Sequence, residues 1–284
     1  MFMSAKSDVI FKIFFGDEKN KPFLVWLLKS ILDLPWDEYE DIQITDPHMK
    51  REYPGDKLSI LDVKAKTKSG MIIHIEIQIY LPDAMEKRII FYDSKLITEQ
   101  LNSGDEYDSI NRVISIVITG ETLLNKHNQY HDRFVMYSPG TQTQLTDILE
   151  VHTLELPKLP PESDGTDLWN WLKFIQAENK EELAMLVQNN PQMQGPVDKL
   201  LQVNQDSYAR RAFEAREKER RDILSRERRV RREGVQEGMR EGMREGERKA
   251  KLETARNLLE MGTPVEHIAK ATKLTIAEIE ELRP

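Results

Sequence analysis

Residues 1–36 carry an apolar pattern that predicts two helices. The segment VIFKIFF, residues 9–15, is almost wholly apolar and ends before Gly16, a residue suited to the end of a helix. The segment KPFLVWLLKSILDL, residues 21–34, has few polar positions and ends before Pro35, which cannot continue a helix. We expect this second helix to be buried.

The strongest alternation of apolar and polar positions lies between residues 58 and 80. The segments LSILDVKAK, residues 58–66, and MIIHIEIQIY, residues 71–80, both alternate, and Ser69-Gly70 between them is a turn signal. The two segments therefore predict a β-hairpin. A three-residue loop from Lys68 to Gly70 would place Asp62 opposite Glu76 and Lys64 opposite His74, and opposed residues share a face.

The pattern from residue 83 to residue 186 predicts a mixture of helices and strands. A helix rich in aromatic and cationic residues is expected at 83–101 and another, with four buried apolar residues, at 168–186. Three further segments read as strands, and the one at 111–118 is apolar enough for a central position in a sheet. A Pro-rich break separates the last strand from the last helix. The strands are expected at 111–118, 133–138 and 149–156, and the break at about 156–167.

The last part of the chain changes in character. Residues 206–256 have few large apolar side chains and dense charge of both signs, which predicts a long solvated helix. Within it Glu-Gly recurs every four residues, and each glycine costs a helix about 1 kcal/mol relative to alanine. We therefore divide the chain into a main domain at residues 1–190, a charged helical arm at 191–251 and a small helical module at 252–284.

The C-terminal module contains two apparent capping boxes. Thr263 to Glu266 and Thr275 to Glu278 both have the Thr-x-x-Glu pattern that starts a helix, and the helix before them ends at Gly262. The outline is that of a small helix-turn-helix. Its last helix is acidic, which suits a phosphate-lined groove poorly, so we expect a packing or interaction module. The apolar residues expected to pack there are Val265, Ile268, Ala269, Leu274, Ile276, Ile279 and Leu282.

The composition excludes several classes of function. The 284 residues include no cysteine, which excludes disulfides, thiol catalysis and cysteine metal sites and is consistent with a cytoplasmic location. The mean hydropathy is −0.58 and no apolar stretch is long enough for a membrane helix, so we expect no membrane association. We also read no signal peptide at the N-terminus. The net charge of −8 argues against general affinity for DNA.

The hairpin carries the candidate chemistry. Asp62 and Glu76 on opposed positions would repel each other unless a cation lay between them, and carboxylate oxygens are the ligands that Mg²⁺ prefers. The alternative is that these acids belong to the solvated polar face of an antiparallel sheet. The apolar neighbours Ile60, Leu61 and Val63 favour a metal site, because a buried acid is costly unless paired or bound to metal.

The same hairpin resembles a known family. The stretch ILDVKAKTKSGMIIHIEIQ is similar to the core hairpin of the PD-(D/E)XK phosphodiesterase superfamily, and within it the chain resembles the recombination-promoting nuclease (Rpn) family of transposase-like proteins. DVIFKIFFGDEKN is similar to the opening motif of that family, EKRIIFYDSKL to its arginine- and tyrosine-bearing helix and TDILEVHTLELPK to its closing strand. The Glu-Gly repeats and the tail helices are also typical, so the resemblance spans nearly the whole chain.

The resemblance implies a fold and a set of metal ligands. The fold is α/β, with a restriction-endonuclease-like mixed central sheet flanked by helices. Asp62 and Glu76 are then ligands of Mg²⁺ or another divalent cation, and Gln78 holds the third motif position. Asp8 is either a further acid near the metal or a helix cap. The superfamily commonly has lysine where this chain has Gln78, and a glutamine carries no charge.

Other cations are candidates for the roles that Gln78 cannot fill. Lys64 shares the predicted face of Asp62 and is a candidate to supply the missing charge, with Lys12 as a weaker candidate. The alternative is that Lys64 is only a solvated lysine on a polar face. Three residues of the 83–101 helix lie at spacings of four and three and are candidates for contacts with the DNA backbone. The alternative is that the aromatic ring packs on the sheet and the cations are solvated. These residues are Arg88, Tyr92 and Lys95.

The sequence therefore predicts a metal-dependent DNA endonuclease linked to recombination or DNA mobility. One alternative is a catalytically degenerate nuclease fold that binds DNA or protein, and another is a self-associating regulatory protein that acts through its tail. The Glu-Gly repeats would let two helical arms approach closely, which favours a homo-oligomer. The basic run from Arg210 to Arg232 alternates with glutamates, so a solvated arm or coiled coil is favoured there over a DNA clamp.

Overall fold

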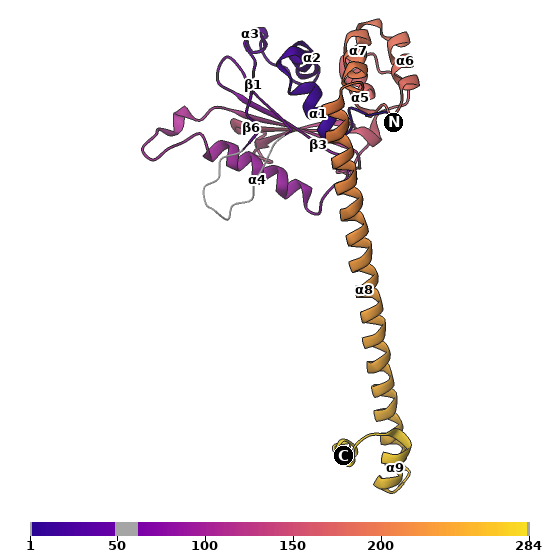
Figure 1. Ribbon diagram of the computed structural model, residues 1–284. Helices are drawn as coiled ribbons and strands as arrows, with labels where there is room; N and C mark the ends of the chain where they lie inside the picture. The colour runs from indigo at the N-terminus through magenta and orange to yellow at the C-terminus, as the bar shows by residue number, and fades with distance from the viewer. Residues whose placement is uncertain (1, 49–61, 283–284) are drawn as a thin grey trace. The chain divides into compact units, whose positions relative to one another are not determined.

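The chain forms two compact units. The structure, a computed structural model, describes residues 2–48 and 62–282 (Figure 1). The first unit comprises Met1–Arg216 and the second comprises Glu217–Pro284. The first unit thus continues past residue 190, where the sequence suggested a boundary, because the α7 helix (Gln194–Val203) contributes Val197 and Leu200 to the main hydrophobic core.

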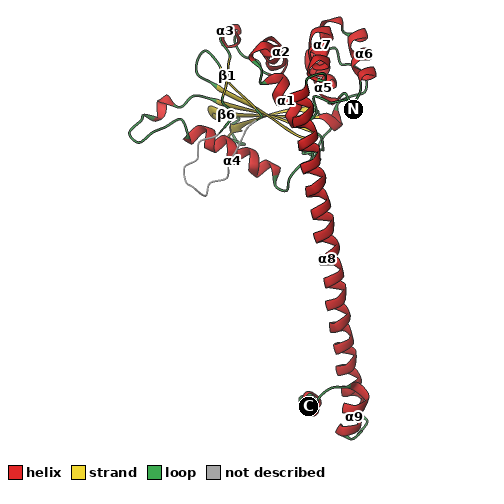
Figure 2. Cartoon of the chain, in the orientation of Figure 1, coloured by secondary structure: helices red, strands yellow, loops and turns green. Residues whose placement is uncertain are grey.

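A six-stranded mixed sheet lies at the centre of the first unit, as the resemblance implied (Figure 2). The strand order is β1-β2-β3-β4-β6-β5, in which β3, β4 and β6 run parallel and the other neighbours are antiparallel. The strands are β1 (Gln43–Thr45), β2 (Val63–Lys66), β3 (Ile72–Gln78), β4 (Val113–Thr119), β5 (His131–Tyr137) and β6 (Gln144–Glu155).

The predicted hairpin is confirmed as β2 and β3. Lys64 lies opposite His74 in the register, as the three-residue loop required, and Gly70 in that loop has a φ of 96°. A Cβ at Gly70 would lie 2.7 Å from the side-chain oxygen of Asn111, so this turn needs a glycine. The first residues of the predicted strand, including Ile60 and Leu61, lie outside the described residues.

Helices cover the two faces of the sheet. The first helices, α1 (Asp8–Phe15) and α2 (Lys21–Ile31), pack with α5 (Asp167–Gln176) against one face, whereas α4 (Met85–Thr98) lies on the other (Figure 1). The shorter helices of the first unit are α3 (Trp36–Glu40), α6 (Lys180–Asn189) and the 3₁₀ helices at Glu18–Asn20, Tyr107–Ser109, Leu156–Lys158 and Pro191–Met193.

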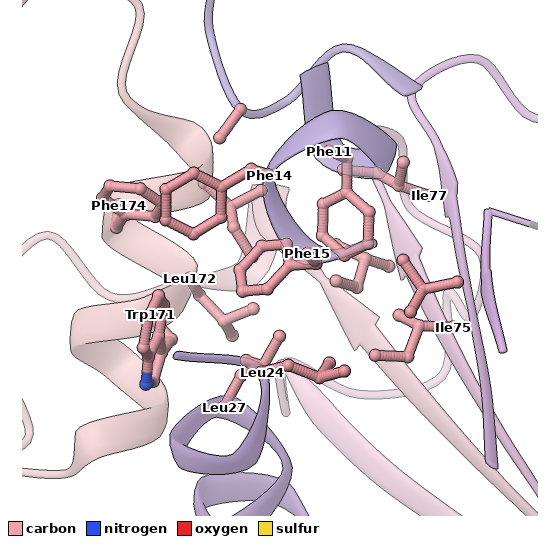
Figure 3. Close-up of a cluster of buried hydrophobic side chains, with 14 of the residues drawn as sticks. Phe11, Phe14, Phe15, Leu24, Leu27, Ile75, Ile77, Trp171, Leu172 and Phe174 are labelled. Atoms are coloured by element: carbon pink, nitrogen blue, oxygen red, sulfur yellow. The ribbon is translucent and has the colours of Figure 1, made fainter. Parts of the chain in front are cut away.

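Aromatic side chains build the main core between α1 and α5. Phe14 and Phe15 of α1 contact each other edge to face, and each also contacts an aromatic ring of α5, Phe174 and Trp171 respectively (Figure 3). Three alternating isoleucines of β3 face this core, so the polar residues between them face α4. The alternation in the sequence therefore separates the two faces of β3 correctly.

The structure has two helices where the sequence predicted one. The sequence suggested a single helix at residues 168–186, but α5 ends at Gln176 and α6 begins at Lys180. The side chain of Asn179 accepts a hydrogen bond of 2.9 Å from the backbone N–H of Glu182 and so caps the N-terminus of α6. This cap starts a new helix in a segment whose apolar spacing alone is compatible with a single continuous helix.

The N-terminal segment is bound to α7 through one side chain. Asn204, which follows α7, accepts a hydrogen bond of 2.7 Å from the backbone N–H of Met3 and donates one of 2.9 Å to the carbonyl oxygen of Met3. Asn204 also donates to the carbonyl oxygen of Leu200 at 3.0 Å. Both Met3 and Asn204 are buried, so this contact closes the first unit across most of its length in sequence.

The second unit is helical. The α8 helix (Ser207–Glu260) supplies most of it, and α9 (Val265–Thr272) and α10 (Ile276–Glu280) follow. The four repeat glycines lie within α8, and a Cβ at any of them would meet nothing within 4 Å. They are Gly234, Gly238, Gly242 and Gly246.

The tail confirms one predicted cap and corrects another. Thr275 and Glu278 form the predicted capping box. The predicted box at Thr263 is wrong, because α9 starts after Pro264 and has no side-chain cap. Ile276 is also 51% exposed rather than buried, because the small core around Ile268 and Ile279 is filled without it.

No helix within residues 2–48 and 62–282 combines the length and the apolar character that crossing a lipid bilayer requires.

Candidate active site at the β2–β3 hairpin

Asp62 lies one residue before β2 and points toward β3. Its Oδ2 atom accepts a hydrogen bond of 2.8 Å from the backbone N–H of Ile77, and its Oδ1 atom lies 3.6 Å from the Nζ atom of Lys12. Only 12% of the side chain is exposed. Burial raises the pKa of the Asp62 carboxyl to about 6, and the charges of Glu76 and Asp8 add to that rise against the hydrogen bond from Ile77 and the charge of Lys12.

Glu76 is the central polar residue of β3. Its side chain is 5% exposed and its Oε1 atom accepts two hydrogen bonds, one of 2.7 Å from Nε2 of Gln78 and one of 3.2 Å from Nη2 of Arg88. Gln78 therefore contacts the carboxylate two positions before it on the same strand. Because β3 alternates, Glu76 and Gln78 share the face that α4 covers.

Asp8 is the first residue of α1. Its Oδ2 atom lies 2.7 Å from both Nε and Nη2 of Arg216, near the start of α8, and its Oδ1 atom accepts from the backbone N–H of Val9. The helix cap position belongs to Ser7, which makes no side-chain cap. The charge of Asp8 contributes to the raised pKa of the Asp62 carboxyl.

Each of the three predicted acids is thus paired with a cation from a different helix. Lys12 of α1 contacts Asp62, Arg88 of α4 contacts Glu76, and Arg216 of α8 contacts Asp8. Lys12 was the weaker sequence candidate for this position. Arg216 was not identified at all, because 208 residues separate it from Asp8 and no local pattern links them.

The chemistry of the acids fits a hard divalent cation. Asp62 and Glu76 provide two mostly buried carboxylates whose negative charges repel each other. Mg²⁺ is typically held by one or two carboxylates together with substrate phosphate. Across the described part of the chain, no group of three or more His, Asp or Glu side chains surrounds a position for one ion. A site at this hairpin would therefore rest on Asp62 and Glu76.

Lys64 lies on β2 opposite His74, at the position the sequence predicted. It is half-buried, and its backbone carbonyl accepts a hydrogen bond of 3.3 Å from Thr45 on β1. No ion pair of Lys64 with an acid is found within the described residues. Lys12, in contrast, contacts Asp62 directly.

The three predicted DNA-binding residues lie along α4. The guanidinium of Arg88 lies 5.0 Å from the ring centre of Tyr92, so these two share a face of the helix. Tyr92 packs with Leu96 and Val113 between α4 and the sheet. Lys95 is 9% exposed. All three therefore lie on the helix that covers this face of the sheet, and Arg88 contacts the candidate ligand Glu76.

A buried polar cluster lies beside the acids on the same face. Nε2 of His74 lies 2.8 Å from Oδ1 of Asp93 on α4, and the hydroxyl of Ser115 on β4 contacts both groups. The three residues are 0–1% exposed. Sequence reasoning missed this cluster, although an aspartate on the buried face of a helix, between Ile89 and Leu96, is a signal of a buried partner.

A second polar cluster occupies the opposite face of the sheet. Glu150 of β6 accepts hydrogen bonds from Nη2 of Arg133 at 2.7 Å and from Arg112, and its other oxygen lies 2.7 Å from Nε2 of His152. His152 in turn lies 2.8 Å from Nε2 of His131. Burial alone would raise the pKa of Glu150, but the hydrogen bonds from His152 and Arg133 and the charge of Arg112 lower it to about 2.

A family of known sequences matches most of the chain. A sequence family described as PD-(D/E)XK nuclease family transposase matches residues 5–227, which include every residue of the candidate site. The chain belongs to this family. No curated protein and no solved structure matches the chain. The mixed sheet flanked by helices is the fold that the resemblance of the hairpin implied, and PD-(D/E)XK membership identifies the chain as nuclease-like.

Proposed function

We propose that this protein is a Mg²⁺-dependent DNA endonuclease that hydrolyses phosphodiester bonds in recombination or DNA mobility. The observation that carries the proposal is the pair of mostly buried carboxylates, Asp62 and Glu76, at the end of the β2–β3 hairpin in a chain of the PD-(D/E)XK nuclease family. Buried acids of this kind are costly unless a cation compensates them.

The polar side chains of the hairpin have different proposed roles in hydrolysis. Asp62 and Glu76 would hold the divalent cation, which supplies polarisation of the phosphodiester and a water of lowered pKa. Gln78 donates a hydrogen bond to the carboxylate of Glu76 and so orients it. The amide of Gln78 can also accept a hydrogen bond from the attacking water or donate one to it. In-line attack on phosphorus adds negative charge to the phosphate oxygens, and a nearby ammonium group stabilises that charge.

The cation that replaces the usual lysine is Lys12 or Lys64. The contact of Lys12 with Asp62 places its ammonium group at the site, which supports Lys12. Lys64 shares the face of the acids through its register with His74. Arg88, Tyr92 and Lys95 are proposed to contact the DNA backbone. Arg88 is placed to exchange its contact with Glu76 for a phosphate when the carboxylate is taken up by the cation.

Two observations favour a second function, in which the fold binds DNA or protein without cleaving it. Gln78 stands where the superfamily commonly has lysine, and each candidate acid is already paired with a cation. A site whose acids are neutralised by Lys12, Arg88 and Arg216 is stable without a metal. In that case Asp62 would be needed for stability and not for catalysis.

Plasmid nicking with and without Mg²⁺ distinguishes the two functions. The wild-type chain is compared with Asp62→Asn and Glu76→Gln, which keep the size and a hydrogen-bond acceptor of each side chain, and with Asp108→Asn as an exposed control. We expect Mg²⁺-dependent nicking that both site variants lose and the control keeps. Metal-independent nicking, or equal nicking by all four proteins, would refute the proposed active site. No nicking by the wild type would favour the binding function.

Self-association through the helical arm is a separate proposal. The support is the four-residue Glu-Gly repeat, whose glycines leave one line of α8 without side chains and would let a second helix approach closely.

A further inference from the structure

The net charge of the chain is unevenly distributed between the two units. Acidic residues outnumber basic residues in Met1–Arg216, which contains the candidate active site, and basic residues outnumber acidic ones in Glu217–Pro284. Affinity for a nucleic acid rests largely on cations that neutralise phosphates. A nuclease whose catalytic unit carries a net negative charge therefore gains affinity for DNA from a positively charged surface elsewhere on the chain.

The highest density of positive charge is a short segment of α8. Between Arg226 and Arg232 the sequence has five arginines and a single acid, Glu227. Every side chain of this segment is exposed. Within the described residues, Arg226, Arg228, Arg231 and Arg232 have no carboxylate at ion-pair distance, whereas Arg229 has only a distant contact with Glu233 at 3.9 Å.

Helical spacing gathers most of these cations on one side. Arg221, Arg228 and Arg232 are separated by seven and four residues, and Ser225 and Arg229 fall between them on the same face. Residues Ser225, Arg228, Arg229 and Arg232 also line one shallow hollow together with Arg226 and Asp222. We define the arginine face as Arg221, Ser225, Arg228, Arg229 and Arg232.

The dimensions of the arginine face fit a nucleic-acid backbone. Its length from Arg221 to Arg232 is about 16 Å at 1.5 Å per residue, and a DNA duplex carries about one phosphate charge per 1.7 Å of its axis. Several phosphates therefore lie within reach of the face at once. Guanidinium groups bind phosphate through two parallel hydrogen bonds, and the hydroxyl of Ser225 adds a neutral donor.

The neighbouring part of α8 is less suited to binding phosphates. From Glu237 to Arg248 arginines alternate with glutamates, and Arg240 is bound to Glu237 at 2.6 Å while Arg248 is bound to Glu278 at 3.3 Å. Glutamates there cancel the field of the arginines. The sequence alone favoured a solvated arm for the whole basic run, because it did not show which arginines are paired.

We propose that the arginine face of α8 is a binding surface for the phosphate backbone of duplex DNA. The inference rests on the proposed function only for the choice of DNA as the polyanion. It assigns to the second unit a share of substrate affinity that the acidic first unit does not supply. The contacts are with phosphates, so the surface adds affinity and not sequence specificity.

The test compares two pairs of arginines on the same helix. Arg228→Ala/Arg232→Ala removes two unpaired cations of the arginine face, and Arg240→Ala/Arg244→Ala removes two cations at the same spacing where glutamates alternate. Both changes alter the net charge equally, and alanine is the best helix former, so neither should unfold α8. Binding of the full-length proteins to a fluorescent DNA duplex is measured by anisotropy in metal-free buffer at several salt concentrations.

We expect the arginine-face variant to bind the duplex at least about five-fold more weakly, with a salt slope reduced by about 1.8, which is about 0.9 for each phosphate that is no longer neutralised. The matched variant should stay within about two-fold of wild type. Arg228→Lys/Arg232→Lys keeps the charges and should largely restore binding. Equal weakening by both alanine pairs, or none by the arginine-face pair, would overturn the proposal.

Two further arms distinguish other polyanions. An RNA duplex of the same sequence and vesicles containing phosphatidylserine are tested with the same variants. Binding of RNA or vesicles that depends on the arginine face, with no such dependence for DNA, would overturn the assignment to DNA. Because no metal is present, the result does not depend on cleavage. A failure of Asp62→Asn to abolish nicking would refute the proposed active site while leaving this measurement intact.

Discussion

The carboxylate of Asp62 accepts the backbone N–H of Ile77 at 2.8 Å, although Asp62 itself lies one residue outside β2. The side chain thus takes a position beside β3 that is fixed by the main chain of its neighbour. A change of Asp62 to alanine removes both the charge and this hydrogen bond, whereas asparagine keeps an acceptor. Asp62→Asn therefore separates the effect of the charge from the effect of local structure.

Lys12 and Lys64 should differ in their effect on cleavage. Lys12→Gln removes the ammonium group that lies 3.6 Å from Asp62, and we expect nicking to fall by about 100-fold to 1,000-fold, the usual effect of removing one electrostatic interaction with a transition state. Lys64→Gln is the matched variant. A larger loss in Lys64→Gln would show that the cation predicted from the sequence is the catalytic one, and unchanged nicking in both would exclude either role.

His74 and Asp93 should be coupled in stability. Removing one partner leaves the other buried with the Ser115 hydroxyl as its remaining contact, so His74→Ala and Asp93→Ala are each expected to cost about 1–3 kcal/mol. The double variant should cost less than the sum by more than about 1 kcal/mol. All four tryptophans lie in the first unit, so their fluorescence in urea follows its unfolding. Ser115→Ala is a milder variant of the same cluster, and additive costs throughout would contradict the coupling.

Glu150 should make the first unit sensitive to acid. Since its pKa is lowered from 4.5 to about 2 in the folded chain, its stabilisation is present above pH 4.5 and is lost as the pH falls through 2. The contribution is about 3 kcal/mol, at about 1.4 kcal/mol per pKa unit. We expect Glu150→Gln to be less stable by up to that amount at pH 6 and to lose this part of the pH dependence. Glu106→Gln, an exposed change, serves as the control. Parallel pH profiles for wild type and Glu150→Gln would refute the assignment.

The repeat glycines should be replaceable without steric cost. A Cβ at Gly238 or Gly242 meets nothing within 4 Å, so alanine should stabilise the helix by about 1 kcal/mol at each site. Circular dichroism at 222 nm during heating measures this effect, with Gln236→Ala as a nearly neutral control in the same helix. If two arms pair through the glycines, light scattering should show less oligomer in the alanine variants. Unchanged mass with higher helix stability would exclude that interface.

The sequence predicts the sheet well where the local pattern is decisive. Three isoleucines of β3 alternate with polar residues, so the strand, its apolar face and its register with β2 all follow from one short segment. The apolar run of β4 likewise places it at the centre of the sheet, where every residue is buried. Asp62 and Glu76 were named from this same local pattern, and Gln78 from the resemblance of the hairpin to the PD-(D/E)XK superfamily.

The partners of the site residues are not predictable in this way. Arg216 reaches Asp8 across 208 residues, and Arg88 reaches Glu76 from a helix on the covering layer. These contacts depend on how separate elements pack, and no periodicity encodes them. The break between α5 and α6 was missed for a different reason, because a single capping side chain, Asn179, overrides an apolar spacing that also fits one helix.

The bonds from Asn204 to Met3 determine where the chain can be shortened. A protein cut after residue 190 would lose α7 and Asn204 together, so the backbone N–H and carbonyl of Met3 would lose their partners and the main core would lose Val197 and Leu200. A cut after Arg216 keeps these bonds and the contact with Asp8. The smallest fragment that folds by itself should therefore include both ends of Met1–Arg216, and a bulky tag fused directly before Met3 would disturb the hydrogen bonds that join them.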